Sequence, residues 1–341
     1  MSKYPEIKHK YSLLSYLQKK VKEETDRLPK DFKDLDEWES FKEKLIEKLK
    51  KILSLPKKPH PMSYEIITSS TIEGITFEKV DFNFEEEFYV PSFIYKPSKI
   101  KGKLPAVIIS PGWPHHKYMD TYNDVAFQLA REGFLVLILD HAPFGERQDG
   151  PFQYLPENPS QSVTNIEGIA MLLGISYMGL RVRDNIRAVD YLRLREDVDK
   201  ERIGITGLCE GGMDTCYSAA IDKRMKVVAP LCSCTTYEAW ALEFSNYGVL
   251  GDTTQSVWGI LKFADMQHIF ASIAPRPLLI QNNIKDKWWP ISGYNKVVEL
   301  CKKVFRLYRS GEKFEAYLEN ASHAYHPIFS QRIAKWFKKW L

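Results

Sequence analysis

Apolar side chains in the first 60 residues recur at the three- and four-residue spacing of amphipathic helices. Two apolar stripes are formed, by Leu13, Leu14, Leu17 and Val21, and by Trp38, Phe41, Leu45, Leu49 and Ile52. Prolines between residues 56 and 61 end the second helical stretch. We therefore expect residues 1–62 to form a helical extension that packs on a larger body.

From residue 64 onward the pattern changes to short apolar runs of strand length. These runs cover 65–67, 77–80, 88–95, 106–109, 135–139, 203–206, 227–229, 277–280 and 315–318. Helical patterns at 122–132, 180–194 and 293–304 lie between several of the later runs. This alternation predicts an α/β domain over residues 63–341, with a mainly parallel central sheet and helices on both faces.

The pentapeptide Gly207-Leu208-Cys209-Glu210-Gly211 lies between a strand-like run, 203–206, and a helical run, 216–220. It matches the G-x-S-x-G nucleophile elbow, with cysteine in place of serine, in the strand-turn-helix context that the elbow requires. Such a turn exposes its central side chain above the sheet in a strained conformation. Cys209 is therefore the candidate nucleophile. The alternative is a glycine-rich turn around a buried structural cysteine.

Two further stretches carry a resemblance to a known family. They are 184–204, which leads into the elbow, and 274–280, which precedes a predicted loop. With the elbow, they make residues 65–341 resemble the α/β-hydrolases, in particular the group of acetyl xylan esterases and dienelactone hydrolases, whose fold is like that of prolyl oligopeptidase. The resemblance implies an α/β-hydrolase fold and an enzyme that acts on ester bonds. A peptidase is disfavoured, because the N-terminal segment is too short for a propeller domain.

In these hydrolases the acid and the base follow the nucleophile along the chain, each after a strand. Asp286 lies in a loop after a predicted strand and resembles the family's acid, with Asp265 as the reserve candidate. His323 follows the last predicted strand and takes the place of the base. His326, three residues further on, stays an alternative base. The resemblance thus implies a Cys-His-Asp triad.

Acyl transfer also needs two backbone N–H groups that bind the developing oxyanion. Glu210, directly after the candidate nucleophile, is expected to provide one of them. The loop at 110–114, Ser-Pro-Gly-Trp-Pro, follows an early strand and resembles the family's oxyanion loop. Trp113 is the expected second donor, because the prolines in this loop have no N–H. The alternative is a rigid turn that exposes an indole.

A thiol near a helix N-terminus and a histidine forms a thiolate readily. Dienelactone hydrolases use G-x-C-x-G in this way, so the resemblance implies a carboxylic ester hydrolase for small acyl esters or lactones, with an acyl-enzyme intermediate. Two alternatives stay open. One is a serine-type acetyl esterase in which Cys209 replaces the serine. The other, from a different class, is an inactive hydrolase-like protein that binds a ligand.

The substrate pocket is harder to predict. Aromatic side chains near strand ends often line such a cleft, and Tyr118, Trp240 and Trp288 are the candidates, although aromatics there are as often part of the core. The segments 141–174 and 234–269 are candidate lids.

Composition narrows the possible partners, cofactors and cellular location. The chain has 48 basic and 44 acidic residues in 341, a balance too mild to indicate a nucleic-acid partner. It shows neither a signal-peptide pattern nor an apolar run of membrane-spanning length, so we expect a cytoplasmic protein without a membrane partner. Five cysteines indicate free thiols, and Cys232 and Cys234 are spaced too closely for the usual zinc pair. We therefore expect no metal and no cofactor, a small-molecule ester as the partner, and leave a homo-oligomer open.

Overall fold

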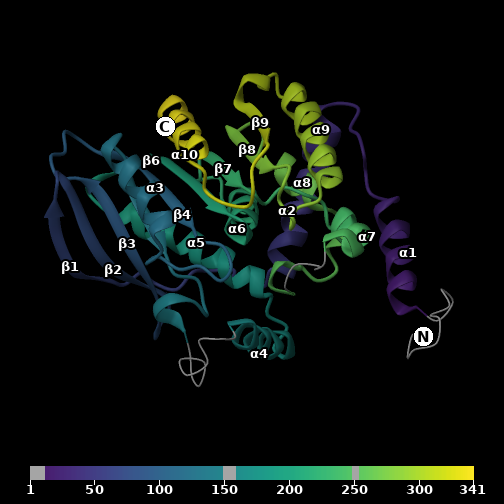
Figure 1. Cartoon of the computed structure of the whole chain (residues 1–341), viewed down its shortest axis with the longest axis horizontal. Coiled ribbons are helices and arrows are strands. Elements are labelled where there is room, and N and C mark those ends of the chain that lie inside the picture. Colours follow the sequence, from purple (N-terminus) through teal and green to yellow (C-terminus); the bar gives the residue numbers. More distant parts are fainter. Residues whose placement is uncertain (1–11, 149–158, 248–252) are drawn as a thin grey trace.

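A nine-stranded sheet forms the centre of the molecule in the computed structural model, which describes residues 12–148, 159–247 and 253–341 (Figure 1). The strands are β1 (Tyr64–Ile72), β2 (Ile75–Glu85), β3 (Phe88–Pro97), β4 (Leu104–Ser110), β5 (Leu135–Leu139), β6 (Val198–Leu208), β7 (Val227–Leu231), β8 (Leu278–Asn283) and β9 (Phe314–Glu319). Their order across the sheet is β1-β2-β3-β5-β4-β6-β7-β8-β9. Each predicted strand is therefore present.

The sheet has two parts that differ in strand direction. Strands β1, β2, β3 and β5 pair antiparallel. The hairpins of β1, β2 and β3 form the edge of the sheet at the left of Figure 1. From β5 to β9 every neighbouring pair is parallel. Side chains of β5 and β7 are buried along the whole strand, as expected for parallel strands covered on both faces. The prediction of a mainly parallel sheet is confirmed.

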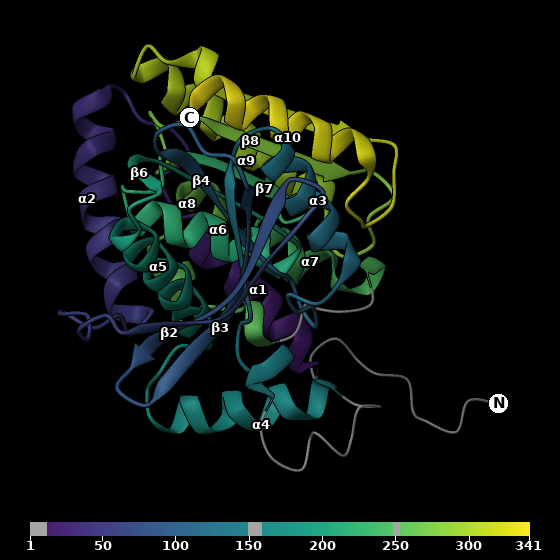
Figure 2. The same ribbon diagram turned by 90° about the vertical axis from the view of Figure 1, so that its left-hand side faces the viewer.

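Helices cover both faces of the parallel part (Figure 2). The helices are α1 (Leu13–Thr25), α2 (Leu35–Ile52), α3 (Asp120–Arg131), α4 (Pro159–Leu172), α5 (Tyr177–Leu194), α6 (Glu210–Ile221), α7 (Tyr237–Tyr247), α8 (Met266–Ala271), α9 (Ile291–Leu307) and α10 (Pro327–Trp340). Helices α3 and α10 pack on one face around Phe329 and Phe337. Helices α2, α5, α6, α8 and α9 pack on the other face around Val189, Met213 and Val297. Short 3₁₀ turns lie at 145–147, 253–255, 260–262 and 311–313.

The two N-terminal helices attach to the main body in different ways. Helix α2 buries Trp38, Leu45 and Leu49 in the same apolar core as the sheet. Helix α1 instead lies beside α7, where the Lys22 ammonium pairs with Glu238 at 3.2 Å. The apolar stripe of the second predicted helix therefore contributes to the core. None of the described helices combines the length and the apolar character that a membrane span requires.

Candidate active site

Cys209 lies at the sharp turn between β6 and α6, above the carboxyl edge of the parallel strands. Its backbone has φ +62° and ψ −127°, a region that residues with a side chain rarely adopt. The turn holds this strained conformation through a hydrogen bond from the Cys209 N–H to the Leu231 carbonyl, 2.9 Å long, at the end of the neighbouring strand β7. The side chain of Cys209 is partly exposed, whereas the other four cysteines are buried. A reactive side chain at this place is thus accessible.

The two outer glycines of the elbow are needed because backbone segments meet there. A Cβ on Gly207 would lie 2.3 Å from the Gly211 carbonyl oxygen. A Cβ on Gly211 would lie 2.0 Å from the carbonyl oxygen of Ser110, at the end of β4. Neither contact is sterically allowed, so only glycine lets α6 start this close to the sheet.

Asp286 and His323 come from loops that follow the adjacent strands β8 and β9, and the parallel pairing of these strands brings the loops together. Nδ1 of His323 lies 2.6 Å from Oδ2 of Asp286. The other carboxylate oxygen accepts a hydrogen bond of 3.0 Å from the Trp288 N–H, so the loop backbone orients the acid. The Asp286 side chain is fully buried, whereas the His323 side chain is 20% exposed. The imidazole is thus partly accessible, whereas the acid that it contacts is not.

Cys209 is the second partner of the His323 ring. Burial by itself would lower the pKa of the His323 imidazole, but hydrogen bonds to Asp286 and to the Cys209 side chain outweigh burial and raise this pKa to about 10. Because Nδ1 faces Asp286, Nε2 is the nitrogen left for the sulfur. The structure therefore brings together the three residues that the sequence singles out as nucleophile, base and acid.

The two alternative candidates, Asp265 and His326, have other roles in the structure. Asp265 caps α8 and accepts hydrogen bonds from the N–H groups of Met266, Tyr237 and Glu238. These contacts are those of a buried helix cap. His326 precedes α10, and its Nε2 lies 2.9 Å from the Ser322 carbonyl oxygen on the exposed side of the loop. The hydrogen bond to Asp286 is made by His323.

The predicted oxyanion donors lie on the two segments that flank Cys209. Glu210 is the first residue of α6. Trp113 follows Gly112, whose Cα is so close to the elbow that a Cβ there would lie 3.0 Å from Cys209 Cβ. The loop after β4 therefore runs directly beside Cys209. The Gly112 N–H donates a hydrogen bond of 2.9 Å to the Tyr122 hydroxyl, which anchors this loop on α3.

Comparison with known proteins agrees with this fold. A model of the Abhydrolase family matches residues 9–324. The chain belongs to this family. It is 26% identical to "Putative hydrolase YtaP" of Bacillus subtilis strain 168 over 295 residues, which are 82% of this chain and 93% of that protein.

Two other proteins resemble this hydrolase. It is 30% identical over 141 residues, 41% of its own length and 50% of the relative's, to "Probable 2-oxo-3-(5-oxofuran-2-ylidene)propanoate lactonase" of Bradyrhizobium sp. A crystal structure of a "putative acetyl xylan esterase" from Bacteroides fragilis NCTC 9343 superposes with a TM-score of 0.77, at 16% identity and over 96% of this chain and 95% of that one. At this identity the structural likeness shows the α/β-hydrolase fold.

The three aromatic residues predicted to contact substrate lie in different environments. Trp240 is buried in the core of the hydrolase, and its Nε1–H donates to the Trp288 carbonyl at 2.5 Å, which supports the loop that carries Asp286. Trp288 itself is 47% exposed. The Tyr118 hydroxyl donates to Glu146 at 2.7 Å. Trp288 and Tyr118 are both exposed, and of the three it is Trp288 that contacts Asp286, through its backbone N–H.

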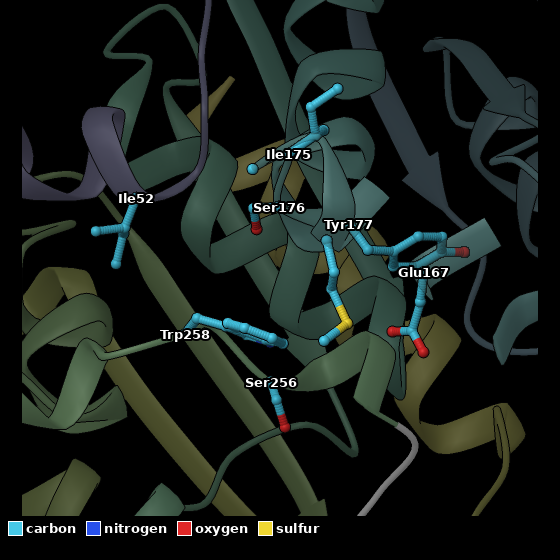
Figure 3. Close-up of a pocket in the computed structure, with 9 residues that line it drawn as sticks. Ile52, Glu167, Ile175, Ser176, Tyr177, Ser256 and Trp258 are labelled. Carbon is cyan, nitrogen blue, oxygen red and sulfur yellow. The ribbon is translucent and has the colours of Figure 1, made fainter. Parts of the chain in front are cut away.

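The candidate lids include residues 149–158 and 248–252, which lie outside the described part of the chain. The described parts of the two lids meet at a cavity of about 110 Å³, shown in Figure 3. Met171 and Ile175 line it from one side, Ser256 and Trp258 from the other, and Ile52 from α2. Residues of both candidate lids, Met171 and Trp258 among them, therefore line one cavity.

His115 and Tyr122 were missed from the sequence because their roles depend on contacts that only the folded chain makes. Nδ1 of His115 lies 2.8 Å from the Tyr122 hydroxyl, and burial, together with the charge of His323, lowers the pKa of His115 to about 4. A neutral His115 can accept the hydroxyl proton, so Tyr122 can accept from Gly112 and donate to His115 together. Two histidines directly after the predicted oxyanion loop were the signal available in the sequence.

Cys232 lies beside the acid. Its sulfur, a carboxylate oxygen of Asp286 and a ring nitrogen of His323 all lie within 4.8 Å of one another. These three residue types can ligate a metal ion. However, His323 Nδ1 is bonded to Asp286, and Cys232 Sγ lies 3.2 Å from the side-chain amide nitrogen of Asn283. Asp286 and His323 are thus arranged as a hydrogen-bonded acid and base.

Proposed function

We propose that this hydrolase cleaves carboxylic esters of small acyl groups, or lactones, through a triad of Cys209, His323 and Asp286. The observation that carries the proposal is the position of the His323 ring between the strained, accessible Cys209 and the buried Asp286. A nucleophile, a base within its reach and a third group that orients the base are the requirements for covalent catalysis.

The first step is acylation. The raised pKa of His323 makes the ring an imidazolium at neutral pH, which stabilises an adjacent thiolate. The Cys209 sulfur attacks the ester carbonyl carbon, and the carbonyl oxygen becomes an oxyanion bound by the N–H groups of Trp113 and Glu210. The bond to the alcohol oxygen then breaks as His323 donates its Nε2 proton to that oxygen. The products are the thioester and the free alcohol.

The second step is hydrolysis of the thioester. His323, now neutral, takes a proton from a water molecule as that water attacks the thioester carbonyl carbon. The second oxyanion collapses, the carbon–sulfur bond breaks, and the acid leaves as Cys209 returns to a thiolate beside the imidazolium. Asp286 keeps Nδ1 protonated throughout and does not take the proton itself.

The similar proteins support the choice of an ester bond. One is named as an acetyl xylan esterase and another as a lactonase, and both names describe hydrolysis at an ester carbonyl. A serine-type acetyl esterase in which Cys209 stands for the serine is the second candidate. The likeness to the acetyl xylan esterase structure favours it, since that protein has the same fold over nearly its whole length.

A burst experiment tests this proposal. Pre-steady-state assays with excess p-nitrophenyl acetate should show a rapid release of one nitrophenolate for each active site, and Cys209→Ala should abolish it. Mass spectrometry of the quenched wild type should find an acetyl group on Cys209. A burst that persists in Cys209→Ala would overturn the assignment of the nucleophile.

The Cys209→Ser variant and a panel of substrates separate the alternatives. Cys209→Ser should release alcohol faster in steady state than the wild type if the site is built for a serine, and slower if it is built for a thiolate. An inactive binding protein would show neither a burst nor turnover with acetyl, longer acyl, lactone and thioester substrates.

A further inference from the structure

Arg181, on α5, has a buried guanidinium group beneath the elbow, and its side chain is only 1% exposed. Nη2 donates a hydrogen bond of 2.7 Å to the Pro111 carbonyl oxygen, in the loop that leads to Trp113. Nε and Nη2 contact a carboxylate oxygen of Asp214, on the first turns of α6, at 2.8 and 2.6 Å. Nη1 lies 3.7 Å from a carboxylate oxygen of Glu210, at the start of the same helix.

These contacts join the two segments that carry the oxyanion donors. Pro111 lies two residues before Trp113, and Glu210 carries the other donor on its own backbone. We propose that Arg181 is a positioning residue that sets the spacing of the Trp113 and Glu210 N–H groups, by holding the loop after β4 and the start of α6 on one guanidinium. This inference rests on the proposed acyl-transfer function.

The chemistry of the group explains why an arginine stands here. A guanidinium is planar and carries five N–H donors in fixed directions, so one side chain can bind a carbonyl and two carboxylates at set angles. A lysine ammonium at the same place would keep the charge but lose the rigid fork. Two buried carboxylates near one cation also tie α6 to α5 electrostatically, because burial leaves little water to screen them.

Asp214 is held in place from a second side. The Ser110 hydroxyl, at the end of β4, lies 3.4 Å from the same carboxylate oxygen of Asp214 that Arg181 binds. Ser110 also lies 2.8 Å from Nε2 of the buried His141, which in turn contacts Asp184 on α5 at 2.9 Å. The guanidinium therefore belongs to a buried network that spans β4, α5 and α6, and it cannot shift without moving several of these groups.

The positioning role of Arg181 predicts a loss of kcat with little change in KM. Oxyanion donors act on the tetrahedral intermediate rather than on bound substrate, so poor spacing should lower kcat and leave KM almost unchanged. Alkylation of Cys209 by iodoacetamide is a direct displacement that forms no oxyanion. Its rate depends on the sulfur and on His323, and should not depend on the spacing of the donors.

The experiment compares Arg181→Lys with Arg187→Lys. Arg187 lies on the same helix, is also buried, and likewise binds a carbonyl, that of Asn83, and a carboxylate, that of Asp190. Arg181→Lys should lower kcat and the p-nitrophenyl acetate burst rate by about 10- to 100-fold, with KM changed less than about threefold and the iodoacetamide rate preserved. Arg187→Lys should keep kcat within about twofold at a comparable loss of thermal stability.

Other outcomes overturn the inference. If Arg181→Lys leaves kcat unchanged, or lowers burst and alkylation rates alike, then Arg181 does not act through the donors. If Arg181→Lys does not fold, Glu210→Gln decides, because it keeps the backbone N–H and removes one charge bound by Arg181. It should lower kcat by about 3- to 10-fold, and an unchanged kcat would contradict the proposal. Failure of the proposed function itself is distinguishable, because the wild type would then show no burst.

Discussion

Gly211 passes so close to Ser110 that a Cβ on Gly211 would lie 2.0 Å from the Ser110 carbonyl oxygen. Gly211→Ala should therefore push α6 away from β4 and lower the free energy of unfolding by roughly 1–3 kcal/mol, as overpacking does elsewhere. Urea unfolding followed by circular dichroism measures this. Gly168→Ala is the matched control, since Gly168 is also helical but has open space around its Cα, and the added methyl should stabilise by about 0.5–1 kcal/mol. Equal effects at both glycines would contradict the steric argument.

The five cysteines should differ in their reactivity. Cys209 is partly exposed beside an imidazolium, whereas burial raises the pKa values of the thiols of Cys216, Cys232, Cys234 and Cys301. Iodoacetamide at neutral pH should thus label Cys209 first, which peptide mass spectrometry can follow over time. His323→Gln should slow this labelling, because it removes the cation beside the sulfur. Labelling of a buried cysteine at the same rate as Cys209 would show that the elbow thiol is not activated.

Substitution of two buried aspartates by alanine should affect different properties, kcat for Asp286 and stability for Asp265. Asp286→Ala removes the group that orients His323, so kcat should fall on the order of 10³-fold or more. Asp265→Ala removes a helix cap, so the free energy of unfolding should fall by about 1–2 kcal/mol while kcat stays close to that of the wild type. Steady-state kinetics and urea unfolding of both variants test the pair. A large loss of kcat in Asp265→Ala would return the reserve candidate to the site.

The raised pKa of His323 links this residue to the pH dependence of stability. The folded-state pKa is about 10 against an ordinary value of 6.5, so the stabilising contribution is complete below pH 6.5 and is lost as the pH rises to about 10. The difference in unfolding free energy between wild type and His323→Gln should shrink across this interval. Urea unfolding at several pH values measures it, with His326→Gln as control, because His326 is partly exposed and makes no contact with Asp286. A difference that grows with pH would mean that the His323 pKa is lowered in the folded state.

Much of the fold could be predicted from the sequence, because local periodicity reports which residues face a core. The nine apolar runs correspond to the nine strands, and the order Cys209, Asp286, His323 along the chain follows from the strands that carry them. The elbow was visible because its glycines and its nucleophile are consecutive. Signals of this kind need no knowledge of tertiary contacts.

The remainder of the site depends on contacts that the sequence does not show. Arg181 binds the carbonyl of Pro111, 70 residues away along the chain, and no spacing rule connects them. Trp240 and Trp288 are both aromatic residues near strand ends, yet one is buried and the other half exposed, because tertiary packing decides their burial. The same holds for Asp265, whose role as a helix cap follows from the fold around it.

Strand β7 separates β6, which leads to Cys209, from β8, which leads to Asp286. Two strand spacings amount to roughly 10 Å, and the single ring of His323 bridges that gap. The reach of one imidazole, rather than the length of any loop, therefore limits how far apart these two strands can stand. A second strand inserted next to β7 would keep the hydrogen bond between Asp286 and His323, which follow adjacent strands, but would move Cys209 out of reach of the His323 ring.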